Sequence, residues 1–128
     1  MSHKYLDDLL PAGKSPYDFY YTDEVRNQKW EKEREQFSFD EREMWLLDFT
    51  FFCWLYEHLR KYREVSPVDL TSKIIKVNNE EKNLEEWIDL MINNAEALIL
   101  LDMYSEENIK LAEFTIEIFK QTIFYLWW

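Results

Sequence analysis

Few residues of this sequence could act as a nucleophile. Cys53 is the only cysteine, and His3 and His58 are the only histidines. Nucleophilic catalysis needs a thiol or hydroxyl beside a base. Cys53 and His58 are five positions apart, whereas neighbouring side chains on a helix are three or four apart. We therefore expect Cys53 to be an inert core thiol with a raised pKa.

The spacing of the acidic residues and histidines also disfavours a metal centre. Helical bundles that hold two metal ions use Glu-x-x-His pairs, but here Glu57 directly precedes His58. The single glycine, Gly13, leaves no room for the glycine-rich loops that bind phosphate. The sequence predicts no catalytic residue, no metal and no cofactor, and it favours a non-enzymatic role.

Acidic residues are concentrated near the end of the chain. The whole sequence has 26 acidic and 15 basic residues, a formal net charge of −11. Residues 80–117 hold eleven acidic and two basic residues, so they carry nine of these excess negative charges. Direct binding of nucleic acid, which needs clustered Lys and Arg, is not expected. The predicted binding residues form an acidic face: Glu85, Glu86, Asp89, Glu106, Glu107 and Glu113.

An acidic helical face has two interpretations. It can imitate a phosphate backbone, as a DNA mimic does, and occupy a partner protein with a basic surface. It can also simply keep a chain that is 18% aromatic in solution.

The chain ends on Trp127 and Trp128. Tryptophan is enriched among the residues that dominate protein interfaces, and side chains at a chain end often stay exposed. These residues are predicted either to contact a partner or to pack back near Trp45 or Trp54. A homodimer would satisfy both interpretations.

The elements that position these residues are predicted to be helices, because one glycine and three prolines disfavour a turn-rich β-fold. Residues 1–21 are expected to form an irregular aromatic arm. A charged helix is predicted over residues 22–36, with Thr22 as its cap. Ser38 and Glu41 have the spacing of a capping box, and the apolar periodicity that follows predicts a central helix over residues 39–63.

The second half of the chain is predicted to contain a short hairpin and two further helices. Residues 73–82 combine β-branched residues with a turn signal, which indicates the hairpin. Asn83 and Ser105 are predicted caps of helices that follow, the first of which reaches about Leu101. The last helix is expected to face the core with one apolar row, namely Ile109, Ala112, Ile116, Phe119 and Ile123. The predicted fold is all-α, a single domain over residues 1–128 with three to four helices around the central one.

Several segments resemble a group of small proteins encoded in phages and prophages of Gram-positive bacteria, to which no active site is assigned. The resemblance lies in residues 10–13 (LPAG), 17–28 (YDFYYTDEVRNQ), 39–45 (FDEREMW), 51–57 (FFCWLYE) and the closing pair of tryptophans. It implies an accessory protein that binds and blocks a bacterial host or defence protein, as anti-CRISPR and other anti-defence inhibitors do.

The expected location is the cytoplasm of the host cell. The N-terminus lacks the basic and then apolar pattern of a secretion signal, and the most apolar stretch, residues 44–59, is too short and too charged to span a bilayer. Two other functions stay open: a module that sequesters a nucleotide signal or a metal among its aromatic residues, and an oligomeric assembly factor.

Overall fold

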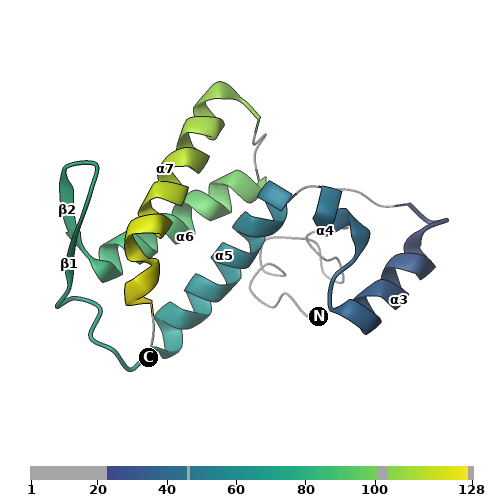
Figure 1. Cartoon of the computed structure of the whole chain (residues 1–128), viewed down its shortest axis with the longest axis horizontal. Helices are drawn as coiled ribbons and strands as arrows, with labels where there is room; N and C mark the ends of the chain where they lie inside the picture. Colours follow the sequence, from purple (N-terminus) through teal and green to yellow (C-terminus); the bar gives the residue numbers. More distant parts are fainter. Residues whose placement is uncertain (1–22, 46, 101–103, 127–128) are drawn as a thin grey trace.

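The computed structural model describes residues 23–45, 47–100 and 104–126 (Figure 1). The elements are α3 (Asn27–Phe37), α4 (Glu41–Trp45), α5 (Leu47–Val65), β1 (Ile74–Val77), β2 (Glu80–Asn83), α6 (Leu84–Leu100), α7 (Glu106–Thr122) and the 3₁₀ turn η1 (Ile123–Tyr125). Helices α5, α6 and α7 pack together, with the hairpin beside α6 and α7 and with α3 at the opposite end. The predicted helical fold with a small hairpin is confirmed.

The core lies between α5 and α6. Both helices present a broad apolar face, and α5 is the central helix that the sequence predicted. Full burial of a large apolar side chain contributes about 1.5–3 kcal/mol, so this contact dominates the stability. The outer side of α5 stays exposed at Leu47 and Trp54. The buried core residues of the two helices are Phe49, Phe52, Cys53, Leu55, Tyr56 and Leu59 of α5, and Leu84, Trp87, Ile88, Met91, Ala95, Leu98 and Ile99 of α6.

The start of the central helical region differs from the prediction. Ser38 is not an N-cap: it ends α3 in the left-handed conformation (φ 69°), and its N–H donates to the Arg34 carbonyl. The cap lies two residues later, where the Asp40 side chain accepts the N–H of Arg42 at 2.9 Å and the Asp40 N–H donates back to the Glu43 carboxylate at 2.7 Å. The predicted helix over 39–63 is described as α4 and α5, on either side of residue 46.

Helix α3 begins later than expected. The prediction placed its start at Thr22, which lies outside the described residues, whereas the helix begins at Asn27. The carboxylate of Asp23 accepts the N–H of Val25 at 2.9 Å, so Asp23 forms a local turn before the helix.

The hairpin and the two later helices begin as predicted. Asn78 and Asn79 both have positive φ values, 48° and 67°, which a tight two-residue hairpin turn requires. Asn83 and Glu86 cap α6 reciprocally: the Glu86 N–H donates to the Asn83 side chain at 2.8 Å, and the Asn83 N–H donates back to Glu86 at 3.2 Å. Ser105 caps α7 by accepting the N–H of Asn108 at 3.2 Å.

The predicted core row of α7 was wrong for three of its five residues, whereas Ala112 and Phe119 are partly buried and pack against the core. The row expected in the core contains three isoleucines that remain exposed, at 43% for Ile109, 48% for Ile116 and 41% for Ile123. The buried residues of α7 are instead Thr115, Ile118 and Thr122. Threonine is tolerated there because each hydroxyl donates to a carbonyl of its own helix: Thr115 to Leu111 at 2.7 Å, and Thr122 to Ile118 at 2.8 Å.

Two predictions concern residues outside the described ranges. The arm of residues 1–21 lies there, as do Trp127 and Trp128, so the assignment of all 128 residues to one domain stays a prediction. Among the described helices, none is both long and apolar enough to cross a membrane.

Candidate interaction surfaces

The residues with reactive side chains lie on different sides of α5. Cys53 is fully buried, and burial, with smaller contributions from Glu57 and Glu43, raises the pKa of its thiol. His58 is exposed and stacks on Trp54 with ring centres 4.5 Å apart. Its Nδ1 lies 2.7 Å from the Trp54 carbonyl, and since a carbonyl can only accept, Nδ1 carries the proton. The described residues contain no group of three side chains suited to a metal ion.

The predicted acidic residues of α6 are engaged within the chain. Arg63 of α5 contacts Glu85 at 2.9 Å and Asp89 at 3.0 Å. Glu86 serves in the cap of α6. Arg63 was missed by the sequence analysis because it precedes Asp89 by 26 residues, and only the packing of α5 on α6 brings the two together.

The predicted acidic residues of α7 are exposed around its first turns. Glu106 pairs loosely with Lys110 at 3.7 Å, with both side chains more than 70% exposed. Glu107 and Glu113 are also exposed. The structure thus places Glu106 and Glu107 together, while Glu113 follows two turns later.

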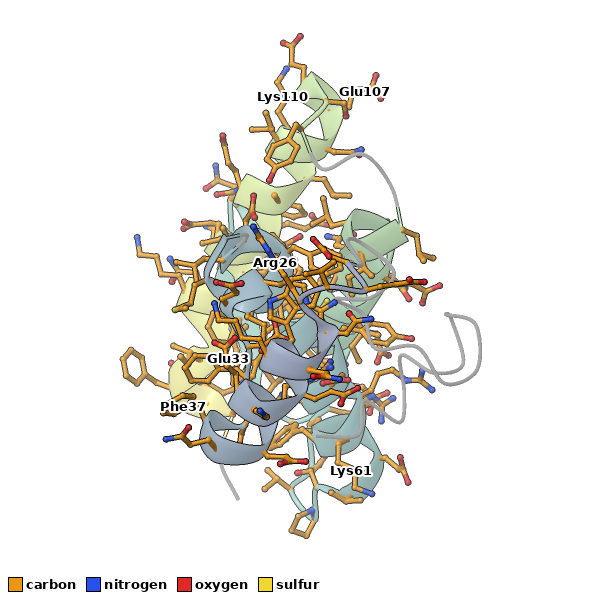
Figure 2. All side chains as sticks on the ribbon, turned by 90° about the vertical axis from the view of Figure 1, so that its right-hand side faces the viewer. Arg26, Glu33, Phe37, Lys61, Glu107 and Lys110 are labelled. Atoms are coloured by element: carbon orange, nitrogen blue, oxygen red, sulfur yellow. The ribbon has the colours of Figure 1, made fainter. Side chains whose placement is uncertain are left out.

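The six acidic residues do not form one continuous face. Helix α6 begins beside the hairpin, whereas α7 begins at the far tip of the molecule (Figure 1). Glu107 and Lys110 mark this tip in the perpendicular view as well (Figure 2). The structure therefore has two acidic groups: one around Arg63, and one at the tip, called the α7 tip below (Glu106, Glu107 and Glu113).

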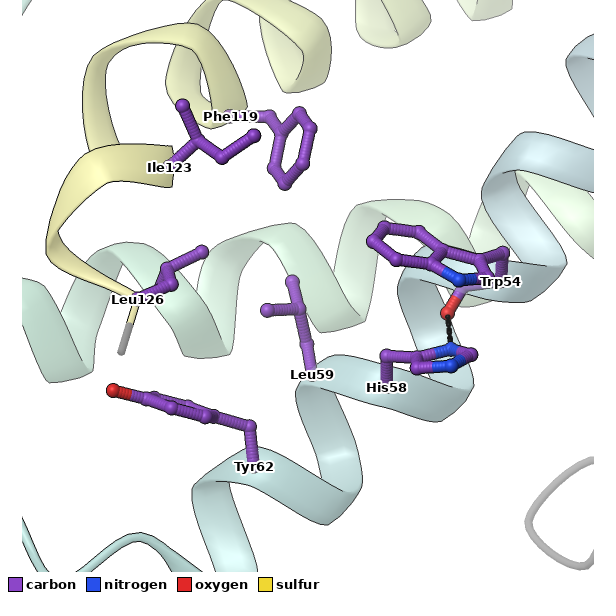
Figure 3. Close-up of a pocket in the computed structure, with 7 residues that line it drawn as sticks. All are labelled: Trp54, His58, Leu59, Tyr62, Phe119, Ile123 and Leu126. Carbon is purple, nitrogen blue, oxygen red and sulfur yellow. Dashed lines mark hydrogen bonds between the residues drawn. The ribbon is translucent and has the colours of Figure 1, made fainter. Parts of the chain in front are cut away.

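A groove between α5 and α7 is the second surface of interest (Figure 3). Its volume is about 260 Å³. Phe119 of α7 closes one side by packing against Phe51 and Trp54, with ring centres 5.7 Å and 6.2 Å apart. The groove is lined by Trp54, His58, Leu59, Tyr62, Phe119, Ile123 and Leu126.

The lining of the groove indicates what it can accept. It is apolar apart from the His58 ring and the Tyr62 hydroxyl, and its volume lies below the roughly 300–1,000 Å³ typical of small-molecule pockets. Such a groove fits one or two apolar side chains of another protein better than a nucleotide. The apolar periodicity of the sequence did not indicate this groove, because it placed Phe119 and Ile123 in the core. Leu126 lines the groove directly before Trp127 and Trp128, the predicted interface residues outside the described ranges.

A buried polar cluster joins α3 to α4. The Asp40 carboxylate accepts from the Arg42 guanidinium at 2.8 Å and 3.1 Å, and both side chains are buried. The Arg42 guanidinium also lies over the ring of Trp30 at 4.2 Å. The Trp30 indole N–H donates to Glu41 at 2.9 Å and, together with Lys29, lowers the pKa of that carboxyl. The cluster orients α3 on α4, which is a structural role.

Comparison with protein-family models, with curated proteins and with solved structures found no match to this chain. The function must therefore be inferred from the surfaces themselves.

Proposed function

We propose that this chain is a non-enzymatic accessory protein of phage type that binds and inhibits a bacterial host or defence protein with a basic surface, as anti-CRISPR and other anti-defence inhibitors do. One observation carries the proposal: nine of the eleven excess negative charges belong to residues 80–117. The resemblance to phage-encoded proteins supplies the biological context.

The α7 tip is the part of this acidic segment best suited to meet a partner. Arg63 already pairs with Glu85 and Asp89, whereas Glu107 and Glu113 are exposed and Lys110 pairs only loosely with Glu106. Glu107 marks the tip in Figure 2. Exposed charges of one sign accelerate the approach of an oppositely charged surface and lose this effect as salt screens them. The α7 tip therefore provides the steering contact, in the place of the single continuous face that the sequence suggested.

The experiment begins by finding the partner. The tagged full-length protein is used to capture binding proteins from a bacterial extract at low and at high salt, with identification by mass spectrometry. We expect one stoichiometric partner that is retained at low salt and lost at high salt. The absence of an enriched partner at either salt concentration would count against the proposal.

A matched pair of variants then tests the role of the α7 tip. Glu106→Gln combined with Glu107→Gln should slow association with the captured partner severalfold at low salt. The control, Glu31→Gln combined with Glu35→Gln, removes the same charge from exposed positions on α3 at the other end of the molecule. Equal effects of the two pairs would show that overall charge, and not the tip, governs binding.

A further inference from the structure

An apolar row runs along α7 to the first residue of η1 and borders the groove to α5 at its C-terminal end; we call it the α7 stripe, and the described residues cover it only in part. The three isoleucines of the stripe are each more than 40% exposed. Phe119 is half-buried because it packs on the rings of Phe51 and Trp54. The stripe consists of Ile109, Ala112, Ile116, Phe119 and Ile123.

The spacing of the stripe is that of a seam between two helices. Its residues alternate at intervals of three and four, as the a and d positions of a heptad do. Such a narrow row contacts one further helix, whereas a core-facing row is broader. The broad, buried side of α7 is already used by Ile118 and its neighbours. Ala112 and Phe119 are partly buried against the core, so the three isoleucines form the exposed part of the stripe.

Two charged residues follow the same edge of the stripe. Glu113 and Lys120 are one heptad apart, exposed, and without an ionic partner anywhere in the described ranges. If a second α7 packs antiparallel with its two-fold axis at Ile116, Ile109 lies opposite Ile123 of the second copy. The heights of Glu113 and of Lys120 of the second copy then differ by one residue, which is about 1.5 Å along the helix axis.

The two-fold axis generates this ion pair twice, so the stripe is complementary to itself in both apolar pattern and charge. A parallel pairing would instead place Glu113 and Lys120 of the second copy on the opposite edge of the seam, where neither ion pair can form. The charge pattern thus selects the antiparallel arrangement.

We propose that a second copy of this chain covers the α7 stripe and forms an antiparallel, two-fold symmetric dimer centred on Ile116. This interface shares only Glu113 with the surface proposed for inhibition; Glu106 and Glu107, whose variants test that function, lie outside it. Each copy has a net charge of −11, so general repulsion outweighs two exposed ion pairs. Dimerisation therefore becomes tighter as salt rises, the opposite of binding to a basic partner.

The oligomeric state of the full-length protein tests the proposal. Sedimentation equilibrium over a range of concentrations should show a monomer–dimer equilibrium that shifts toward dimer at high salt. Ile116→Glu should raise the dimer dissociation constant by roughly 100-fold, because the residue lies on the symmetry axis and is lost from both copies. The control, Ile74→Glu, makes the same change at an exposed isoleucine on β1 and should leave the equilibrium unchanged.

Charge reversal tests the orientation of the two helices. Each single reversal turns both ion pairs into like-charge contacts: Lys120→Glu, which also raises the net negative charge, should weaken the dimer about tenfold, and Glu113→Lys, which lowers it, should weaken the dimer less. The double variant that swaps both charges keeps the net charge and should restore the dimer. An equimolar mixture of the two single variants should associate more tightly than either alone. A monomer at all concentrations, or a dimer insensitive to Ile116→Glu, would overturn the proposal. A dimer that ignores both single reversals would overturn the antiparallel pairing.

Discussion

Neighbouring residues on α7, Thr115 and Ile116, allow a direct test of which side of this helix faces the core. Thr115 is fully buried, and its hydroxyl donates to the Leu111 carbonyl at 2.7 Å. Ile116 is 48% exposed on the outer side. Because the two residues are adjacent, replacing each with aspartate changes helix propensity by similar, small amounts, and the outcome depends on burial.

The expected losses differ severalfold. At position 115 an aspartate is buried among apolar side chains, and an uncompensated buried charge costs several kcal/mol, comparable with the roughly 5–15 kcal/mol that stabilises a whole domain. At position 116 about half of the 1.5–3 kcal/mol for burying isoleucine is lost, plus less than about 1 kcal/mol in helix propensity. We therefore expect Thr115→Asp to unfold the protein or nearly so, and Ile116→Asp to cost about 2 kcal/mol.

The assay is urea unfolding followed by circular dichroism, at protein concentrations low enough to keep the chain monomeric. The control is Thr115→Val, which preserves shape and removes only the hydroxyl; it should change stability by less than about 1 kcal/mol, because the Leu111 carbonyl keeps its backbone donor. A larger loss for Ile116→Asp than for Thr115→Asp would refute this orientation of α7 and favour the face that the sequence predicted.

Three further predictions concern single contacts. Trp87→Phe should cost about 2 kcal/mol in urea unfolding, because it removes the hydrogen bond that the buried indole N–H donates to the Ile75 carbonyl at 2.8 Å and leaves a cavity in the core. Ser38→Gly should raise stability by about 0.5–1 kcal/mol in the same assay, since glycine adopts the φ of 69° without strain. The pKa of Glu41, measured by NMR titration, should lie below its ordinary value of 4.5, chiefly because the Trp30 indole donates to the carboxylate. The charged Glu41 carboxylate stabilises the fold fully above its ordinary pKa, and this stabilisation is lost as the pH falls through the lowered pKa. Glu41→Gln should therefore make the melting temperature fall less steeply in acid.

The helix boundaries show where sequence patterns suffice. Asn83 and Ser105 were predicted as caps because each stands alone before an apolar periodic segment, and both serve as caps. Around residue 40 the sequence offers two overlapping capping boxes, from Ser38 to Glu41 and from Asp40 to Glu43. The positive φ of Ser38 commits it to the end of α3, and that choice depends on the turn between two helices, which a local pattern does not contain.

The orientation of α7 could not be derived from apolar periodicity. The helix has two candidate faces, and the one with the more continuous apolar row is the less buried of the two, with three exposed isoleucines. The buried face includes Thr115 and Thr122, which a hydropathy pattern counts against the core. Their hydroxyls bond to their own helix, which removes the cost of burying them. Only the packed structure shows this compensation.

The acidic segment was predictable in composition and not in geometry. Counting charges identified residues 80–117, but it could not show that Arg63 from the central helix pairs with two of the six selected residues. Nor could it show that α6 and α7 begin at separate places on the molecule. The candidate binding surface is therefore smaller than the sequence suggested, and it is confined to the α7 tip.

The proposed steering surface and the proposed dimer interface share one helix, and their electrostatics oppose each other. Bringing two copies together along α7 adds net charges of −11 to −11, which salt screens in favour of the dimer. Binding of a basic partner at the α7 tip is driven by electrostatic attraction, so added salt weakens it. The pairing centred on Ile116 uses Glu113 but places Glu106 and Glu107 of the two copies at opposite ends of the seam, so the dimer would present two separate acidic ends. One salt titration, with self-association and partner binding measured in parallel, therefore separates the two proposals: slopes of opposite sign are expected if both hold, and a shared sign would show that at least one surface has been assigned the wrong role.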